Sequence, residues 1–145
     1  MKHFRPFVLL LLPLLLAAGC GGGRSSQPSV QQIKEMVAVQ IKKADKMMGG
    51  KYIDNITILD SITFDGKNVV YHNTIDEDRA RMTIKDFMDA PVKDALEINL
   101  QLNWATNPSL EPIKTMIKRL GGMIYYNYIG SQTGDSFSIT IDPED

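Results

Sequence analysis

The sequence predicts an α+β domain in which a four-stranded antiparallel sheet, made of two hairpins, carries helices on one of its faces. Three observations lead to this prediction. Apolar residues recur at three- and four-residue steps in some segments, they alternate with polar residues in others, and glycine- or proline-containing turns separate the two kinds of segment. Because helices and hairpins follow one another in blocks, we expect the order α-β-β-α-α-β-β.

The first predicted helix spans residues 29–48. Ser29 and Gln32 have the three-residue spacing of a capping box, in which each side chain pairs with the backbone N–H of the other residue. An apolar stripe with helical spacing follows, formed by Val30, Ile33, Val37, Ile41, Ala44 and Met48. The dipeptide Gly49-Gly50 then ends the helix, because glycine readily adopts the conformations that follow a helix C-terminus.

The segment after this helix changes to a period of two and predicts the first hairpin. Apolar and polar residues alternate on both sides of Asp65-Gly66, a dipeptide typical of a tight turn. A two-residue loop at this dipeptide pairs Ile62 with Val69 and Ile56 with Ile75. This register places the apolar side chains of both strands on one face of the sheet.

Helical periodicity returns in the middle of the chain, where a proline interrupts it. Thr83 and Asp86 mark the start of a short helix, and Pro91 cannot continue that helix because it has no backbone N–H to donate. We therefore expect a restart with Pro91 in the first turn. The helical segment that follows ends near Trp104 and the dipeptide Asn107-Pro108.

The last part of the chain predicts one more helix and the second hairpin. Ser109 is expected to cap this helix, and Gly121-Gly122 ends it. The hairpin turns in a loop at residues 131–134. Its register pairs Ile124, Tyr126 and Tyr128 with Ile141, Ile139 and Phe137, in that order.

The first 19 residues have the composition of a cleaved signal peptide. Lys2 and Arg5 supply a basic start, and an apolar run broken only by Pro13 follows at residues 7–18. This run is too short for a membrane-spanning helix, which needs roughly 20 apolar residues. We therefore expect removal of this segment, with an uncleaved N-terminal anchor as the alternative.

The single cysteine of the chain, Cys20, stands directly after this apolar run. Residues 16–20 read Leu-Ala-Ala-Gly-Cys and resemble the lipobox of bacterial lipoproteins. The resemblance implies that a diacylglycerol is attached to Cys20, that the leader is removed before it, and that the new N-terminus receives a fatty acid such as palmitate. Each buried CH₂ of such chains contributes about 0.8 kcal/mol, so the lipid would anchor the protein stably to the bilayer.

These features predict three parts of the chain. Residues 1–19 form the lipoprotein signal peptide, residues 20–28 a glycine- and serine-rich flexible tether, and residues 29–145 a single periplasmic α+β domain. In the lipoproteins that this chain resembles, an aspartate after the acylated cysteine retains the protein in the inner membrane. Gly21 stands there instead, which implies the periplasmic face of the outer membrane; the inner membrane and the cell surface are the alternatives.

Composition argues against several function classes. Removal of residues 1–19 leaves 126 of the 145 residues, with 14 basic against 17 acidic side chains and a net charge of about −3. The basic residues are scattered among acidic ones and form no cationic stripe, so we expect no nucleic-acid partner. Beyond Cys20 there is no cysteine for a disulfide or a thiol nucleophile. We expect no cofactor other than the covalent lipid.

Candidate catalytic and metal-binding side chains are few. His72 is the only histidine after the leader, and we interpret it as a surface residue of the first hairpin rather than a metal ligand. Residues 76–78, Asp-Glu-Asp, lack the oxygen spacing of a calcium loop, so we predict a solvated, charged connection and no metal site. The sequence contains no Gly-x-Ser-x-Gly motif, and we predict no enzymatic activity.

Protein binding is the remaining class, and two aromatic residues are its candidate site. Tyr126 and Tyr128 are predicted to pack in the core. Tyr125 lies between residues of that face on a strand, so its side chain must point to the other face of the sheet. We therefore predict partner contacts at Tyr125 and at Trp104, the only tryptophan.

Three segments, residues 52–59, 69–73 and 120–128, resemble a hairpin signature of small bacterial envelope proteins. Some of those proteins are similar to the pilotin lipoproteins, which guide type II secretion subunits to the outer membrane. The resemblance implies a protein partner in the envelope and a role as a pilotin or assembly factor. Two alternatives are a structural or accessory envelope lipoprotein without a client, and a hydrolase of envelope polymers with a carboxylate pair drawn from Glu97, Glu111 and Asp135.

Overall fold

The computed structural model describes residues 26–89 and 91–145. In chain order, the elements of these residues are α1 (Val30–Met48), β1 (Lys51–Tyr52), β2 (Thr57–Phe64), β3 (Val69–Ile75), α2 (Glu77–Ala80), α3 (Ile84–Asp89), α4 (Pro91–Thr106), α5 (Glu111–Arg119), β4 (Ile124–Gly130) and β5 (Ser136–Ile141). The predicted signal peptide, Cys20 and most of the predicted tether lie outside the described residues.

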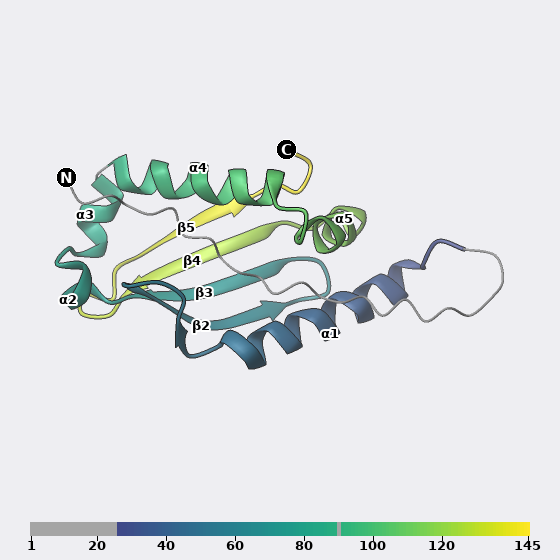
Figure 1. Cartoon of the computed structure of the whole chain (residues 1–145), viewed down its shortest axis with the longest axis horizontal. Coiled ribbons are helices and arrows are strands. Elements are labelled where there is room, and N and C mark those ends of the chain that lie inside the picture. The colour runs from purple at the N-terminus through teal and green to yellow at the C-terminus, as the bar shows by residue number, and fades with distance from the viewer. Residues whose placement is uncertain (1–25, 90) are drawn as a thin grey trace.

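The five strands form one mixed sheet in the order β1-β2-β3-β4-β5. Neighbouring strands are antiparallel except β3 and β4, which run parallel. The α+β class is confirmed, whereas the prediction of four antiparallel strands is wrong in strand number and in the direction of one pair. The parallel pair arises because the chain after β3 forms four helices and returns to the end of the sheet at which β3 begins (Figure 1).

The second hairpin has the predicted register. Tyr126 lies opposite Ile139, and the neighbouring apolar pairs, Ile124 with Ile141 and Tyr128 with Phe137, also have the predicted register. Local alternation and a short loop were sufficient here, because a slip of one residue would turn every apolar side chain of β5 to the opposite face.

The turn of the first hairpin differs from the prediction. Phe64, rather than Ile62, lies opposite Val69, because the loop contains four residues instead of two. The Asp65 carboxylate accepts two backbone N–H groups of this loop, at 2.9 and 2.7 Å, and Gly66 has a φ of +96°. The wider turn is therefore stabilised by its own first side chain.

A β-bulge changes the register of the first hairpin again. The pairing shifts between Leu59 and Ser61, so that Asp60 has no opposite residue. Beyond the bulge Thr57, rather than the predicted Ile56, lies opposite Ile75. At the bulge the backbone N–H of Ile62 donates to the Asp45 side chain at the end of α1 (2.7 Å), a contact that no local pattern indicates.

Most predicted helix ends are confirmed. Ser29 and Gln32 make both hydrogen bonds of the capping box, at 2.8 and 3.2 Å, and Pro91 begins α4 after the short helix α3. The predicted cap at Ser109 is wrong, since Leu110 occupies the N-cap position of α5. A turn precedes this helix, and the backbone N–H of Ser109 donates to the asparagine side chain of that turn (3.0 Å).

The longer helices bury their apolar residues against the same face of the sheet. One core cluster contains buried residues of α1, α3, α4 and α5 together with alternate residues of β2 to β5. Figure 1 shows α1 along β2 and α4 along β5, with α2 and α3 at one end of the sheet and α5 at the other. In the part of the chain that the structure describes, no helix packs on the opposite face. The sheet therefore has a covered face and an open face.

Candidate partner-binding surface

Trp104 lies in the core, on the side of α4 that faces the sheet. Its side chain is 2 % exposed, and its indole N–H donates a hydrogen bond to the Tyr126 hydroxyl (2.8 Å). The Tyr126 ring stacks on the Tyr71 ring, with 4.5 Å between ring centroids and 6° between ring planes. The position of Trp104 does not support the predicted partner contact, because a buried side chain whose only donor is paired offers no surface to another protein.

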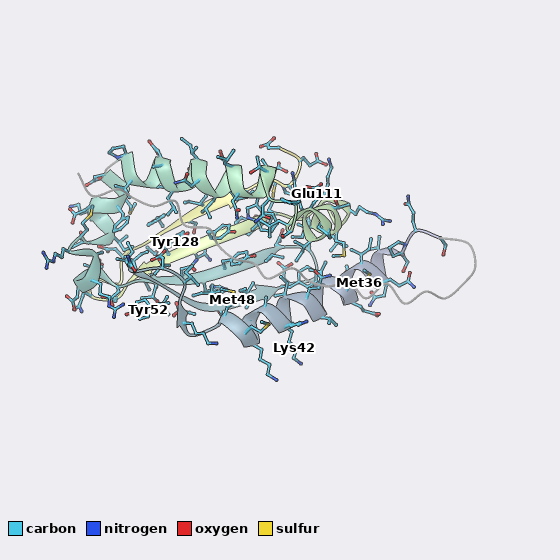
Figure 2. All side chains as sticks on the ribbon, viewed as in Figure 1. Met36, Lys42, Met48, Tyr52, Glu111 and Tyr128 are labelled. Atoms are coloured by element: carbon cyan, nitrogen blue, oxygen red, sulfur yellow. The ribbon has the colours of Figure 1, made fainter. Side chains whose placement is uncertain are left out.

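The aromatic layer continues along β4. Tyr128 stacks on Phe137, with 4.9 Å between ring centroids, and Figure 2 shows Tyr128 over the sheet between α1 and α4. Core packing of Tyr126 and Tyr128 is confirmed. Burial raises the pKa of Tyr71, Tyr126 and Tyr128, because water cannot solvate a phenolate there. These hydroxyls stay protonated at neutral pH, and that of Tyr126 accepts the hydrogen bond from Trp104.

Tyr125 lies on the open face of the sheet, as its place in the strand predicts. Its neighbours across the strands are Val70 on β3 and Thr140 on β5. The side chain of Tyr125 is half-buried, so part of the ring is accessible at the surface. This position is compatible with the predicted partner contact, which stays a prediction.

The open face is mostly polar and neutral. Its members are Tyr52, Ile58, Asp60, Ser61, Thr63, Val70, His72, Thr74, Tyr125, Asn127, Ile129, Ser136, Ser138 and Thr140. Several pairs bond across neighbouring strands: Thr63 with His72 (3.1 Å), Thr74 with Asp60 (2.7 Å) and Ser138 with Asn127 (2.7 Å). His72 thus has the surface position on the hairpin that the sequence predicts. Apolar surface comes from the half-buried Tyr125 and from Ile129, which is 45 % exposed, and at the β1 edge from Tyr52, which is also 45 % exposed.

The carboxylate of Glu77, at the start of α2, is buried and holds the loop between β4 and β5. The side chain is 5 % exposed. Its oxygens accept hydrogen bonds from the backbone N–H groups of Ile84, Gln132 and Thr133 (2.8, 2.7 and 2.9 Å) and from the Thr133 hydroxyl (2.8 Å). The prediction of a solvated connection is therefore wrong for Glu77. Two of its donors, Gln132 and Thr133, lie 55 and 56 positions after it in the chain, so no pattern near Glu77 in the sequence indicates the contact.

These hydrogen bonds determine the charge of Glu77. Burial by itself raises the pKa of this carboxyl, but the donors from Thr133, Ile84 and Gln132 outweigh burial and lower the pKa to about 2. Gly130 leaves the space that the carboxylate fills, since a Cβ there would lie 2.5 Å from Oε1 of Glu77. A glycine at the end of a strand rich in tyrosine and isoleucine is the one sequence signal of this contact.

The three candidate carboxylates of the hydrolase alternative lie on different elements. Glu97 is on α4, Glu111 begins α5 (Figure 2), and Asp135 follows β4, where its carbonyl accepts from Gly130 (2.8 Å). Within residues 26–89 and 91–145, no three His, Cys, Asp or Glu side chains form a group that could hold a metal ion. None of the helices in these ranges combines the length and the apolar character of a membrane span.

Helix α4 has a second apolar surface on the side that points away from the core. Ile98 and Leu102 are 62 % and 57 % exposed, in contrast to Leu100 and Trp104 on the inner side. Exposed alanines extend this surface at both ends. The outer stripe of α4, as we call it, consists of Ala95, Ile98, Leu102 and Ala105.

Comparison with known proteins shows similarity in fold to solved structures and assigns the chain to no family. The sequence matches no protein family, and it matches no curated protein. Among solved structures, the fold resembles the pilotin EpsS from the Vibrio vulnificus type 2 secretion system, with a TM-score of 0.56 and 10 % identity over 79 % of this chain and 91 % of the pilotin. It also resembles a Pseudomonas aeruginosa protein described as "a putative secreted protein", with a TM-score of 0.54 and 13 % identity over 76 % of this chain and 92 % of that one. At these identities the likeness concerns the fold alone.

Proposed function

We propose that this protein is a lipid-anchored envelope protein whose α+β domain binds another protein and acts as a pilotin-like assembly factor, without catalytic activity of its own. The observation that carries the proposal is the fold, which covers 91 % of a type 2 secretion pilotin. One fold can serve several functions, so two further observations support the proposal: the N-terminal sequence and the open face of the sheet.

The N-terminal sequence, which resembles the lipobox of bacterial lipoproteins, supports attachment to a membrane by lipid. In the proposal Cys20 is acylated, and the glycine-rich residues 20–28 let the domain reach a partner in the periplasm while it remains at the outer membrane. An anchor on a flexible tether suits a factor that accompanies an envelope subunit, because it confines the factor to the membrane that the subunit must reach.

The open face is the surface that we propose for the partner. Tyr125 and Ile129 supply apolar contacts there, and hydroxyl and amide side chains surround them. Protein interfaces commonly combine aromatic contacts with a polar surround. On strands β2 to β5 this face contains no lysine or arginine, and Asp60 accepts a hydrogen bond from Thr74. At its β1 edge Arg79 lies over the Tyr52 ring and pairs with Asp76, so the face has no cationic stripe and its chemistry suits a protein better than a nucleic acid.

Photo-crosslinking in membranes of the organism of origin tests this assignment. A photoreactive amino acid at position 125 is expected to capture one secretion-channel subunit, which mass spectrometry identifies. The matched control is the same amino acid in place of Lys42, which is exposed and points away from the sheet (Figure 2). Capture of no protein from position 125, or of the same proteins from both positions, contradicts the proposed surface.

A second experiment separates the anchor from the binding surface. Cys20→Ser is expected to release the domain from membranes and to leave the captured subunit short of the outer membrane, whereas Gly22→Ser should change neither. Fractionation followed by immunodetection measures both effects. A Cys20→Ser protein that stays on membranes contradicts the anchor, and a subunit that still reaches the outer membrane contradicts the pilotin-like role.

An accessory envelope protein without a client is the second candidate. It is favoured by the structural neighbour from Pseudomonas aeruginosa, whose description names secretion but no pilotin role. In the crosslinking experiment, peptidoglycan or many abundant outer-membrane proteins captured from position 125 would support this candidate instead.

A further inference from the structure

The outer stripe of α4 is an apolar surface on the exposed side of a helix. Ile98 and Leu102 lie one turn apart and are 62 % and 57 % exposed, and Figure 1 shows α4 at the rim of the fold. Helix α1 offers a contrast: its exposed Val39 and Met47 are eight residues apart, with three lysines between them. A helix that is apolar on two sides is typical of one that is covered on both.

The residue pattern of this stripe reads the same in both directions. Its centre is position 100. The large residues Ile98 and Leu102 are each two residues from this centre, and the small residues Ala95 and Ala105 are each five residues from it. The polar residues beside the stripe follow the same symmetry: Asn99 mirrors Gln101, and Asp94 mirrors Thr106. The steps of three, four and three residues are those of helices that pack along each other at a shallow angle.

We propose that the outer stripe binds the outer stripe of a second copy of this chain, with the two α4 helices antiparallel about a two-fold axis at position 100. Ile98 of each copy then packs on Leu102 of the other, and Ala95 packs on Ala105, where small side chains let the helix ends approach. A two-fold contact uses the same patch on both copies, so it requires a surface that complements itself. The symmetric stripe meets this requirement.

The charges around the stripe agree with a second copy as the occupant. Residues 98–110 contain no charged side chain. In an antiparallel pair each flank of the stripe meets the same flank of the other copy, so Asn99 lies beside Asn99 of the other copy and Gln101 beside Gln101, where two amides can exchange hydrogen bonds. The Asp94 residues of the two copies lie twelve residues apart along the pair, roughly 18 Å at the rise of an α-helix, so no like charges face each other. A membrane surface fits less well, because helices that lie on anionic lipid carry lysines and arginines beside the apolar face, and here Asp94 and Glu97 outnumber Lys93.

The size of the stripe sets the expected strength. A helix pair of three turns buries well under the roughly 800 Å² per partner of a standard stable interface, so we expect weak association in dilute solution. Confinement to one membrane raises the effective concentration and strengthens the contact. Only this strengthening depends on the proposed anchor; the contact itself does not.

Two differently tagged copies of the full chain test the contact in membranes by co-purification after crosslinking. Ile98→Glu alone and Leu102→Lys alone are each expected to weaken self-association by about tenfold or more, because a charge then faces an aliphatic side chain of the other copy. When the two variants are mixed, association between them is expected to return. In the antiparallel pair the new carboxylate of one copy meets the new ammonium group of the other.

The matched control is Val39→Lys on α1, where the native side chain is 68 % exposed; it should leave self-association unchanged. All three positions are exposed, so the variants should keep the urea midpoint of the parent protein, which shows that they fold. A parent that does not self-associate in membranes overturns the proposal, as do single variants that associate like the parent. Mixed variants that stay apart overturn the antiparallel pairing, because a parallel pair sets each new charge against an unsubstituted residue.

A different partner for the stripe would also be visible. If Leu102→Lys loses some other captured protein while the parent never pairs with its own copy, the second copy is the wrong occupant. Capture from position 125 is a separate readout on the open face, so failure of self-association leaves the test of the proposed function intact.

Discussion

Tyr125 and Tyr126 are neighbours on β4, yet the two faces of the sheet give them different roles. Tyr126 is buried, stacks on Tyr71 and accepts a hydrogen bond from Trp104, whereas Tyr125 is half-buried on the face without helices. Successive residues of a strand point to opposite faces. The position within the strand, rather than the residue type, therefore decides which tyrosine stabilises the core.

The two faces also differ in what holds them. The covered face combines stacked rings, a buried indole–hydroxyl hydrogen bond and, beside Gly130, the carboxylate of Glu77. The open face has short polar pairs such as Ser138 with Asn127. We therefore expect substitutions on the covered face to lower the free energy of unfolding, and substitutions on the open face to change partner binding.

The largest expected effect on the covered face is that of Trp104→Ala, which should lower the free energy of unfolding by about 3–5 kcal/mol, because it leaves a large cavity in the core. Urea unfolding followed by far-ultraviolet circular dichroism measures the loss. Ile98→Ala on the exposed side of the same helix is the control and should change the free energy by less than about 1 kcal/mol. Equal losses at both positions would contradict the core role of Trp104.

Glu77→Gln should produce the next largest loss at neutral pH. The amide cannot accept from three backbone N–H groups with the strength of a carboxylate, and its NH₂ group would face donors. Folding lowers the pKa of Glu77 from the usual 4.5 to about 2, so its ionised form stabilises the protein above pH 4.5 and this contribution disappears as the pH falls towards 2.

The measurement for Glu77 is the difference in urea midpoint between the parent and Glu77→Gln as a function of pH. This difference should be largest above pH 4.5 and shrink towards pH 2. Other carboxyls titrate equally in both proteins and cancel in the difference. Glu144→Gln in the exposed C-terminal segment is the matched control. A difference that stays constant over this pH range would show that the charge of Glu77 does not stabilise the loop.

Tyr126→Phe isolates a single hydrogen bond of the covered face. It removes the acceptor of the Trp104 indole N–H and should cost about 1–3 kcal/mol, because the buried donor is left unpaired. Because Trp104 is the only tryptophan, its fluorescence reports both the unfolding transition and the change in its surroundings. The control is Tyr125→Phe, with no expected change in stability. If the two variants unfold at the same urea concentration, the indole–hydroxyl bond contributes nothing measurable.

Ile129→Thr should have the smallest effect on stability, within about 0.5 kcal/mol, because the side chain is 45 % exposed and the replacement is also β-branched. Its effect should appear in binding: with a photoreactive amino acid at position 125, the yield of captured partner is expected to fall. Val39→Thr on α1 serves as the exposed control. An unchanged yield would restrict the proposed surface to the other end of the open face.

Local patterns in the sequence were sufficient wherever the stabilising contact is made between near neighbours. Ser29 and Gln32 predicted the capping box, Pro91 predicted the start of α4, and the alternation around Tyr126 predicted the register of the second hairpin. The same alternation placed Tyr125 on the opposite face from Tyr126. Each of these follows from a period or a cap that spans only a few residues.

Patterns failed where the contact partner lies far away in the chain. The Asp45 side chain reaches the backbone at the bulge of β2. The sequence predicts Gly122 only as part of a helix end, whereas in the structure it leaves room for the carbonyl of Lys67 in another loop. Trp104 lies on the side of α4 that packs against the sheet. Helical spacing in the sequence shows which residues share a side of the helix, but it does not show whether other elements cover that side.

The sequence by itself determined the class of the fold, the positions of the longer helices and both hairpins, and the face of β4 to which each tyrosine points. Only the tertiary structure decided that β3 and β4 run parallel, that Glu77 is buried and charged, and that α4 has an apolar side left exposed. The physical reason is the separation along the chain between the groups that interact. Helix caps and strand alternation depend on neighbouring residues, whereas strand pairing and burial depend on groups that only the folded chain brings together.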